Sequence, residues 1–420
     1  MIPINQQLTR IAAKVRAAAA VPGNLAIFGA SKHKFVLNPP LAAGTVIEFE
    51  HTHEIRLPEA YRVFITSLAD GGVGPSYGLL PLADAYAELS GIFHGHLAVP
   101  SPFEPGMTYG NEWWDEFFDE EDNRDPCQGA IAVVHHGCTS YTLLIVSGPA
   151  RGRLVSIDLN GVPAPYVLED NDFLCWYERW LDELAAGYDV SRVFEKIPGG
   201  EDELLAIAAT DPSPERRARS TWSLCALPAL TPAGLRALAD VITDPIASVR
   251  SAALRAARHF RASEAEDQAR TALQDTDPAV RSEAMSTLQA LQISDLATIA
   301  RTMLSDPDHD VTFRAIWALR DSGKLAVEDL APLTSAADPR VRATATHYLQ
   351  DAVGDGIDTL LTTALGDSQA QVRWTAVQVV VRRNLRHLQP HLTALLKIET
   401  DRTVLINLQR ALPQLTEGRL

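Results

Sequence analysis

A short phrase that recurs at even intervals constrains the second half of this chain more than any other feature of its sequence. The phrase is Asp-Pro followed by Val-Arg, and six intervals between its copies cover 190 residues, about 32 each. That period suits a pair of helices and is too short for a separate domain, so we expect a stack of helical pairs. The aspartates that open the copies are Asp211, Asp244, Asp277, Asp306, Asp338, Asp367 and Asp401.

Each copy of the phrase carries the signals that start a helix. In one copy, the Asp277 side chain can cap the coming helix, and Pro278 fits its first turn because no amide is needed there. Behind it, Val280, Ala284 and Leu288 recur at helical spacing and form an apolar stripe. One helical pair cannot bury that stripe alone, so neighbouring pairs must stack on it. Equivalent stripes are Val249, Ala253 and Ala257, then Val341, Ala345 and Leu349, then Val372, Ala376 and Val380.

Arginine occupies one position in successive copies of the phrase. We expect these side chains to form a ladder of ion pairs with the repeated aspartates, and a row of ligand-binding arginines is the alternative. The ladder is interrupted where Thr312 replaces arginine, and Asp367 is followed by Ser368 in place of proline. We interpret both departures as ordinary variation between repeats. The arginines are Arg250, Arg281, Arg342 and Arg373.

With these features, residues 203–415 resemble HEAT repeats of the short Asp-Pro-Val-Arg type. The resemblance implies an all-α solenoid of about six to seven repeats over residues 201–420, and it specifies a fold more than an activity. Some HEAT-like proteins are DNA glycosylases with a basic concave face, and others are lyases acting on bilin chromophores. Trp222, Trp317 and Trp374 could stack on a base in such an enzyme, but we expect core or ridge packing, because this half lacks a basic excess.

The distribution of charge separates classes of partner. The net charge is −16, with 13 basic against 25 acidic residues in 1–200 and 24 against 28 in 201–420. This balance opposes nonspecific binding to nucleic acid or anionic lipid and favours a basic protein partner. No apolar run approaches the roughly 20 residues that a membrane span needs. The cysteines form no C-x-x-C motif, so we expect reduced thiols and a cytoplasmic protein; they are Cys127, Cys138, Cys175 and Cys225.

The first half has a different pattern, in which short β-rich runs are separated by glycine and proline. Apolar residues at helical spacing predict an N-terminal docking helix and an aromatic helix that closes the sheet, while alternating runs predict antiparallel strands. We expect helices at 4–15, 57–68 and 173–184, a turn at 74–78 leading into a short strand that ends at Pro81, and strands at 130–134, 141–146 and 154–159.

Three motifs in this half resemble the SUKH superfamily over about residues 40 to 190. They are Leu57-Pro-x-x-Tyr-Arg-x-Phe64, the loop from Gly71-Gly72 to Gly74-Pro-x-Tyr77-Gly-Leu79, and Phe173-x-x-Trp-Tyr-x-x-Trp-Leu181. The family includes a yeast regulator of cell-wall synthesis and many bacterial immunity proteins that neutralise toxins. The resemblance implies an α+β domain at 1–200, with helices covering an antiparallel sheet, and it implies binding without catalysis.

The most unusual stretch is residues 111–125, where eight acids and one arginine are interleaved with aromatic residues. It could anchor a basic toxin domain, because complementary charge speeds encounter and a buried tryptophan supplies affinity. The alternative is a solvated helix and loop whose Trp113 and Phe117 cover the sheet. The partner-binding residues we predict are Asp70, Tyr77, Trp113, Trp114, Asp115, Glu116, Asp119, Glu120 and Glu121.

Other candidate sites have weaker signals. His94, His96, His135, His136 and Cys138 lack zinc-like spacing, and neighbouring histidines on a strand point to opposite faces, so we expect no metal and no cofactor. Asp70 has no paired carboxylate and is interpreted as a helix-ending residue. Ser76 and Ser140 lack a Gly-x-Ser-x-Gly elbow, and no phosphate-binding loop occurs.

These observations lead to one hypothesis with two rivals. We expect an intracellular, non-enzymatic protein-binding module, an immunity protein that occludes the cationic cleft of a toxin nuclease through its acidic face. The first rival is a regulatory or scaffolding protein unrelated to toxins. The second is a lyase or glycosylase built on the solenoid. The sequence leaves the partner and the oligomeric state open.

Overall fold

The computed structural model describes residues 3–89, 91, 95–107, 109, 113–115, 125–161, 164–191 and 196–416. Contacts between residues divide the chain into two compact units, Met1–Gly234 and Leu235–Leu420. The first unit holds a small sheet with helices, and the second is entirely helical in its described part. Each unit is described by itself.

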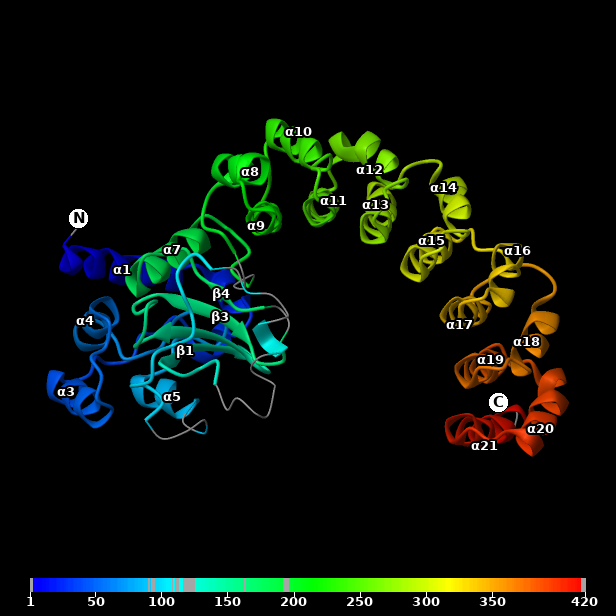
Figure 1. Ribbon diagram of the computed structural model, residues 1–420, viewed down its shortest axis with the longest axis horizontal. Coiled ribbons are helices and arrows are strands. Elements are labelled where there is room, and N and C mark those ends of the chain that lie inside the picture. The colour runs from blue at the N-terminus through cyan, green and yellow to red at the C-terminus, as the bar shows by residue number, and fades with distance from the viewer. Residues whose placement is uncertain are drawn as a thin grey trace. The chain divides into compact units, whose positions relative to one another are not determined.

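A four-stranded antiparallel sheet lies at the centre of the first unit. Its strands follow one another in chain order, so each is joined to its neighbour by a short connection (Figure 1). Irregular steps in the pairing of the first two strands fall between Ala132 and Val134 and between His135 and Gly137. The three predicted strands are confirmed, and a short fourth is added. The strands are β1 (Ala130–Gly137), β2 (Ser140–Ile145), β3 (Leu154–Asp158) and β4 (Tyr166–Val167).

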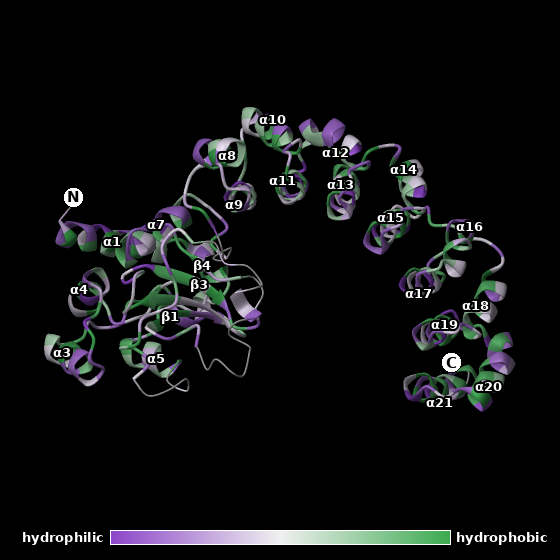
Figure 2. Ribbon diagram, viewed as in Figure 1, coloured by the Kyte–Doolittle hydropathy of each residue, from purple (hydrophilic) through white to green (hydrophobic). Residues whose placement is uncertain are grey.

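Both faces of the sheet are buried, which explains why its strands are apolar along most of their length (Figure 2). Alternate residues point to different cores. Ile131 and Leu144 belong to a cluster formed with the helices, whereas Leu143 and Val155 belong to a second cluster under the segment that contains Phe103. The sheet therefore separates a helix-covered core from a loop-covered one.

The N-terminal and the aromatic helix pack together, as their apolar stripes predicted. Glu178 on α7 accepts hydrogen bonds from Arg10 and Lys14 of α1, and Asp172 caps α7 by accepting from the amide of Cys175 at 2.8 Å. Leu79 forms only isolated bridges, so the predicted strand near it shortens to a single paired residue. The helices of this unit are α1 (Ile4–Ala19), η1 (Pro22–Ala26), α2 (Ala30–His33), α3 (Ala43–Thr52), α4 (Glu59–Ser67), α5 (Leu82–Ala87), α7 (Phe173–Ala185), α8 (Glu201–Thr210) and α9 (Pro214–Leu224).

The first helical pair, α8 and α9, belongs to the same compact unit as the sheet. Arg216 on α9 makes a two-bond ion pair with Glu169, just after β4, at 2.9 Å for each N–O contact. The amide of Ile197 also donates to the hydroxyl of Ser223 at 2.9 Å. These contacts join the helical pair to the sheet, although its sequence belongs to the repeat pattern. The domain boundary that we predicted at residue 200 marks the point where the repeat pattern begins, and it stays a prediction.

The second unit is built from two rows of helices (Figure 1). One row, here called the ladder row, consists of α11, α13, α15, α17, α19 and α21, each packed on the next. The helices are α10 (Pro232–Val241), which crosses the boundary between units, α11 (Ala247–Phe260), η2 (Ser263–Ala265), α12 (Glu266–Ala272), α13 (Pro278–Leu291), α14 (Leu296–Met303), α15 (His309–Asp321), α16 (Val327–Leu330), η3 (Leu333–Ser335), α17 (Pro339–Tyr348), α18 (Ile357–Leu365), α19 (Ala370–Arg382), η4 (Arg386–Leu388), α20 (Gln389–Ile398) and α21 (Arg402–Thr416).

Three of the repeated aspartates, Asp277, Asp338 and Asp401, cap helices of the ladder row, as predicted. Asp277 accepts from the amide of Ala279 at 2.8 Å, and Asp338 caps α17 in the same way. The assignment was wrong for the other four: α15 is capped by Asp308 and not by Asp306, α9 is capped by Ser213 and not by Asp211, and α11 and α19, which follow Asp244 and Asp367, have no side-chain cap. Acids two residues apart, such as Asp306 and Asp308, therefore have different roles. Only the second acid of such a pair caps a helix.

At this level of detail, an α-solenoid with a small antiparallel sheet region is confirmed. Among the described residues, none of the helices is both long enough and apolar enough to cross a bilayer.

Candidate functional site

The acidic stretch is only partly visible, because Glu116, Asp119, Glu120 and Glu121 lie outside the described residues. Of its described members, Asp115 is exposed and Trp113 is half-buried. Trp113 lies 5.3 Å from the ring of Phe103, centre to centre. The alternative of side chains that cover the sheet therefore accounts for Trp113 in this structure.

Trp114 corrects our expectation of an aromatic anchor for a partner. Its side chain is 3% exposed and belongs to the core under the sheet, together with Phe103 and Leu143. A side chain buried in this way offers no surface to another protein. Trp114 is thus buried more deeply than Trp113.

Asp70 holds its own loop. Its carboxylate accepts a hydrogen bond from the amide of Leu82 at 2.8 Å, and its carbonyl accepts one from the Asn38 side chain at 2.9 Å. Partial burial raises the pKa of Asp70 from its usual range, against the opposing effect of the Leu82 hydrogen bond. The group acts as a turn-forming residue, as the helix-ending interpretation proposed, and these contacts engage it within the chain.

Tyr77 is the predicted site residue most available to a partner, with 38% of its surface exposed. Its ring lies 5.2 Å from that of Phe28, which is 53% exposed, and the Lys32 ammonium lies 5.3 Å from the Tyr77 ring centre. Gly29 allows this contact, because a β-carbon there would stand 2.1 Å from the carbonyl oxygen of Ser76. Tyr77, Phe28 and Lys32 thus form a small exposed aromatic corner.

A buried hydrogen-bond chain begins next to Tyr77. The Ser76 hydroxyl lies 2.8 Å from Nδ1 of His136, and Nε2 of that ring lies 2.8 Å from the hydroxyl of Thr142. Burial, reinforced by nearby His135, lowers the pKa of His136 to about 3, so its ring is neutral at physiological pH. The Ser76–His136 contact has the length expected for a catalytic serine and its histidine base. In a catalytic triad, however, a carboxylate orients the second ring nitrogen, whereas here that nitrogen contacts the hydroxyl of Thr142.

Sequence reasoning missed this chain, because Ser76 and His136 are 60 residues apart and neither stands in a local motif. The prediction that His135 and His136 face opposite ways is confirmed, since Nδ1 of His135 lies 3.2 Å from the carboxylate of Glu88. In the part of the chain that the structure describes, no three His, Cys, Asp or Glu side chains gather as metal ligands would.

In the second unit the arginines form a ladder of ion pairs, as expected, but only two of the four carboxylates, Asp306 and Asp367, belong to the repeated aspartates. Arg281 donates to the carboxylate of Asp306 through Nε at 2.7 Å and Nη2 at 2.8 Å, and its Nη1 donates to the carbonyl of Asp275 at 2.9 Å. Each such arginine thus holds its own helix start and reaches the next repeat. The other pairs are Arg250 with Asp275, Arg342 with Asp367 and Arg373 with Glu399.

The ladder is interrupted at both members of one expected ion pair, Thr312 and Ala336. Thr312 keeps the local contact, since its hydroxyl donates to the carbonyl of Asp306 at 3.1 Å, but it cannot reach the next repeat. There, Ala336 occupies the place of the acid, because Arg342 donates to its carbonyl at 2.9 Å. A backbone bridge joins the two repeats instead, with the amide of Val353 donating to the carbonyl of Leu325 at 3.1 Å.

In each helix of the ladder row, two positions belong neither to the ladder of ion pairs nor to the fully buried core. We call these positions the row face. The first follows the arginine and holds Ser251, Ser282, Phe313, Ala343, Trp374 and Ile406. The second lies one helical turn further and holds Arg255, Ser286, Trp317, His347, Gln378 and Arg410. Large apolar side chains therefore collect in the later repeats, whereas arginine occurs in the first, at Arg255, and in the last, at Arg410.

The aromatic part of the row face is exposed. Trp317 keeps 37% of its surface, and the Arg320 guanidinium lies 5.1 Å from the Trp317 ring centre. Phe313 lies beside it on α15, with a ring separation of 6.3 Å. Of the two alternatives that we expected, core or ridge packing, the exposure of Trp317 excludes packing in the core. The total charge of the second half also concealed a local excess, because residues 370–416 contain seven basic and two acidic residues.

Comparison with known proteins supports the repeat assignment. Residues 235–320 match a family described as HEAT repeats. No curated protein matches the chain. Similar solved structures include the YibA protein of Escherichia coli, at 16% identity and a TM-score of 0.41, covering 60% of this chain and 90% of that one.

Two further solved structures are similar. The complex of CpcE and CpcF of phycocyanin lyase from Nostoc is 16% identical, with a TM-score of 0.33, covering 52% of this chain and 95% of that one. An archaeal HEAT-like repeats protein from Thermococcus onnurineus is 13% identical, with a TM-score of 0.35, covering 52% and 98%. Likenesses this distant carry no inference about function, whereas the family match places HEAT repeats in this chain.

Proposed function

We propose that this chain is a non-catalytic scaffold that binds a partner protein on the row face of its HEAT repeats. The observation that carries the proposal is the exposure of Trp317 beside Phe313 and Arg320. The core does not require a large aromatic residue at Trp317, since the equivalent positions in the other repeats hold polar or charged residues: Arg255, Ser286, His347, Gln378 and Arg410. Tryptophan and arginine are the residues most enriched at the centres of protein interfaces.

The binding surface proposed here differs from the one that the sequence suggested. The acidic residues of the first unit remain available for electrostatic attraction, with Asp115 exposed. Trp114, however, is buried in the core under the sheet and is not exposed to a partner. The exposed aromatic residues lie on the HEAT repeats and at the Tyr77 corner, and among these the row face supplies both arginine and tryptophan.

The proposal is tested by quantitative affinity capture from the native cell with three baits. These are the wild-type chain, Trp317→Ala, and Ile398→Ala, which removes a side chain that is 76% exposed on α20, outside the ladder row. Proteins that bind the wild type and Ile398→Ala but are depleted at least about tenfold with Trp317→Ala are expected, as for an interface hot spot. Equal capture by all three baits contradicts the proposal, provided that circular dichroism melts of the variants agree.

A narrower function, toxin immunity, is a second candidate. Two observations favour it: the motifs of residues 57–64, 71–79 and 173–181 that resemble the SUKH superfamily, and the 25 acidic against 13 basic residues of the first 200. An acidic surface of this kind would occlude the cationic cleft of a toxin nuclease.

Immunity is tested with purified basic toxin domains, using the wild-type chain and a variant with the acids of residues 112–122 made neutral. Tight binding that the neutral variant loses would support immunity, together with inhibition of the toxin's nuclease activity. Absence of binding to every toxin domain encoded beside the gene would contradict it and leave the scaffold proposal standing.

A further inference from the structure

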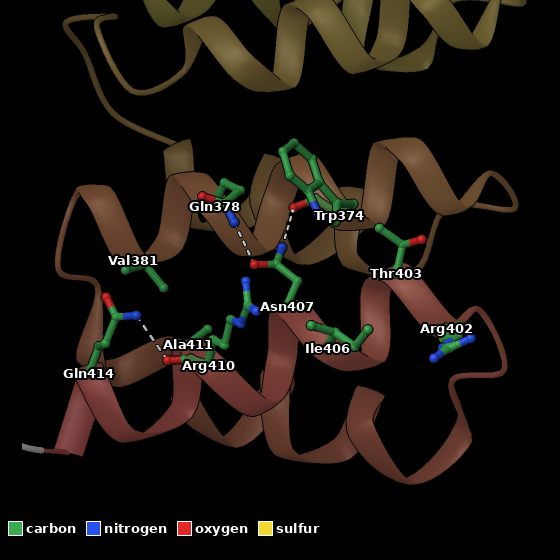
Figure 3. Close-up of a pocket in the computed structure, with 10 residues that line it drawn as sticks. All are labelled: Trp374, Gln378, Val381, Arg402, Thr403, Ile406, Asn407, Arg410, Ala411 and Gln414. Carbon is green, nitrogen blue, oxygen red and sulfur yellow. Dashed lines mark hydrogen bonds between the residues drawn. The ribbon is translucent and has the colours of Figure 1, made fainter.

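A cavity of about 480 Å³ lies on the row face between α19 and α21. Its wall includes an indole, an isoleucine, the two hydrogen-bonded amides of Gln378 and Asn407, and two arginines, with a third amide at Gln414 (Figure 3). Figure 3 shows the Arg410 guanidinium reaching from α21 toward Gln378 and Asn407, with Arg402 at the other end of the cavity beyond Ile406. Trp374 closes the side formed by α19.

The two amides are already engaged with each other. Gln378 donates from Nε2 to Oδ1 of Asn407, and Asn407 donates from Nδ2 to the carbonyl of Trp374 at 3.1 Å. Asn407 is 7% exposed, so this network forms a fixed part of the wall. Within the described part of the chain, neither Arg402 nor Arg410 has a hydrogen-bond or ion-pair partner for its guanidinium. The cavity thus presents unengaged cationic donors beside a fixed apolar and amide surface.

Among the described residues of the segment 370–416, no carboxylate is available to neutralise the charge of Arg402 and Arg410. Both acids of residues 370–416 are committed, since Glu399 pairs with Arg373 at 2.6 Å and Asp401 caps α21 by accepting from the amide of Thr403. None of the described side chains that line the cavity is a carboxylate. A second cavity, beside α12, lacks this property, because its Arg250 is held by Asp275.

We propose that this cavity binds an acidic segment of a partner protein, with carboxylates on Arg402 and Arg410 and an apolar side chain against Trp374 and Ile406. The inference rests on the scaffold function proposed above and specifies the chemistry of its partner. Guanidinium groups recognise carboxylates through paired hydrogen bonds, and an aromatic or aliphatic anchor supplies the apolar contact. A nucleic acid is disfavoured, because the net charge of −16 repels a phosphate backbone.

The test uses two labelled synthetic peptides, one of alternating Glu and Leu and one of alternating Lys and Leu, with fluorescence anisotropy at low salt. The wild-type chain is expected to bind the Glu–Leu peptide, and added salt should weaken that binding. The double variant Arg402→Ala/Arg410→Ala should weaken it roughly tenfold, about 1.4 kcal/mol. The matched control Arg386→Ala/Lys397→Ala removes the same charge from the same segment outside the cavity and should change binding less than about twofold.

Three outcomes overturn the inference: no binding of the Glu–Leu peptide by the wild type, equal losses in the two double variants, or equal binding of the Lys–Leu peptide. Stronger binding of a single-stranded oligothymidylate than of the Glu–Leu peptide overturns it as well, in favour of nucleic acid. Failure here is distinct from failure of the scaffold proposal. If Trp317→Ala loses the captured partner while Arg402→Ala/Arg410→Ala retains it, the scaffold stands and the cavity assignment falls.

Discussion

Arg281 and Asp306 form an ion pair with two hydrogen bonds, and the pair joins neighbouring helical pairs of the second unit. The same carboxylate also accepts from the amide of Asp308 at 2.9 Å, so it shapes the turn that leads into α15. One acidic side chain therefore fixes a local turn and a contact between repeats at once. This double role accounts for the recurrence of an acid at this position, which Asp275, Asp367 and Glu399 hold in other repeats with the same two kinds of contact.

Replacing Asp306 with Asn should destabilise the second unit by about 2 kcal/mol, between the values for buried and for exposed ion pairs. The reason is that the side chains of Arg281 and Asp306 are 12% and 7% exposed, so the guanidinium would lose its charged partner in a poorly hydrated place. Urea unfolding followed by circular dichroism measures the change. Arg340→Ala is the matched control, because that side chain is 71% exposed, and it should shift the unfolding by less than about 0.5 kcal/mol. Equal effects would show that the ladder pair contributes no more than a surface contact.

The ladder should also make the second unit sensitive to acid. The hydrogen bond from Arg373 lowers the pKa of Glu399 from 4.5 to about 2, and the hydrogen bond from Arg342 lowers that of Asp367. A carboxyl group whose folded pKa is depressed stabilises the fold above its unfolded pKa, and that contribution is lost as the pH falls through the folded value. Unfolding free energy should therefore decline between pH 4.5 and about 2.

Glu399→Gln is the variant that isolates this effect. It should be less stable than the wild type at neutral pH and should lose less stability on acidification, because the titrating group is gone. Parallel curves of unfolding free energy against pH for the two proteins would refute the assignment to Glu399.

The repeats could be predicted from sequence because their signals are local. Asp277 followed by Pro278 is typical of a helix start, and the spacing of Val280 and Ala284 identifies the face to be buried. The partner of each arginine could not be assigned as easily. Two acids stand before α13, before α15 and before α21, and only three-dimensional contacts show that Asp275 pairs with Arg250 while Asp277 caps a helix.

Restoring the missing rung should stabilise the solenoid, because Thr312 and Ala336 occupy the places that arginine and aspartate hold elsewhere. Thr312→Arg alone should destabilise, since residue 312 is 1% exposed and the new guanidinium would lack a carboxylate. The double variant Thr312→Arg/Ala336→Asp should recover stability, with a coupling energy of about 1 to 2 kcal/mol in a double-mutant cycle.

Hydrogen exchange provides a second measurement of the restored rung. Amides of α15 and α17 should exchange more slowly in the double variant than in the wild type, whereas amides of α19 and α21 should be unaffected, because stability in repeat proteins propagates mainly to neighbours. Additive single effects, with no coupling, would mean that the interruption is more than a missing ion pair.

The candidate site was harder to predict than the fold, and for a physical reason. An aromatic residue next to acids can turn toward the core or toward solvent, and the local pattern around Trp113 and Trp114 does not decide which one does. The structure places Trp114 inside and leaves Trp317 exposed, although Trp317 stands in an apolar helix. A count of charge over single repeats would have revealed the basic end of the solenoid, which the sum over 220 residues concealed.

His136 should give the first unit its own dependence on pH. Burial lowers the pKa of this imidazole from 6.5 to about 3, so the unfolded chain binds a proton there at a higher pH than the folded chain. Stability from the neutral ring is then fully present above pH 6.5 and is lost as the pH falls toward 3. The ring signals of His136 should not shift in an NMR titration above about pH 4.

Replacing His136 with Gln separates burial from hydrogen bonding. At neutral pH the variant should be destabilised by about 1 to 3 kcal/mol, because the hydroxyls of Ser76 and Thr142 each lose a partner held at 2.8 Å. Between pH 6.5 and 3, however, its stability should fall less steeply than that of the wild type, since glutamine does not titrate. His391→Gln, at an exposed position on α20, should leave both quantities unchanged. The contrary outcome is that the stability of His136→Gln falls as steeply with pH as that of the wild type. That result would mean that another group in the first unit binds the proton and that His136 is ionised in the folded chain.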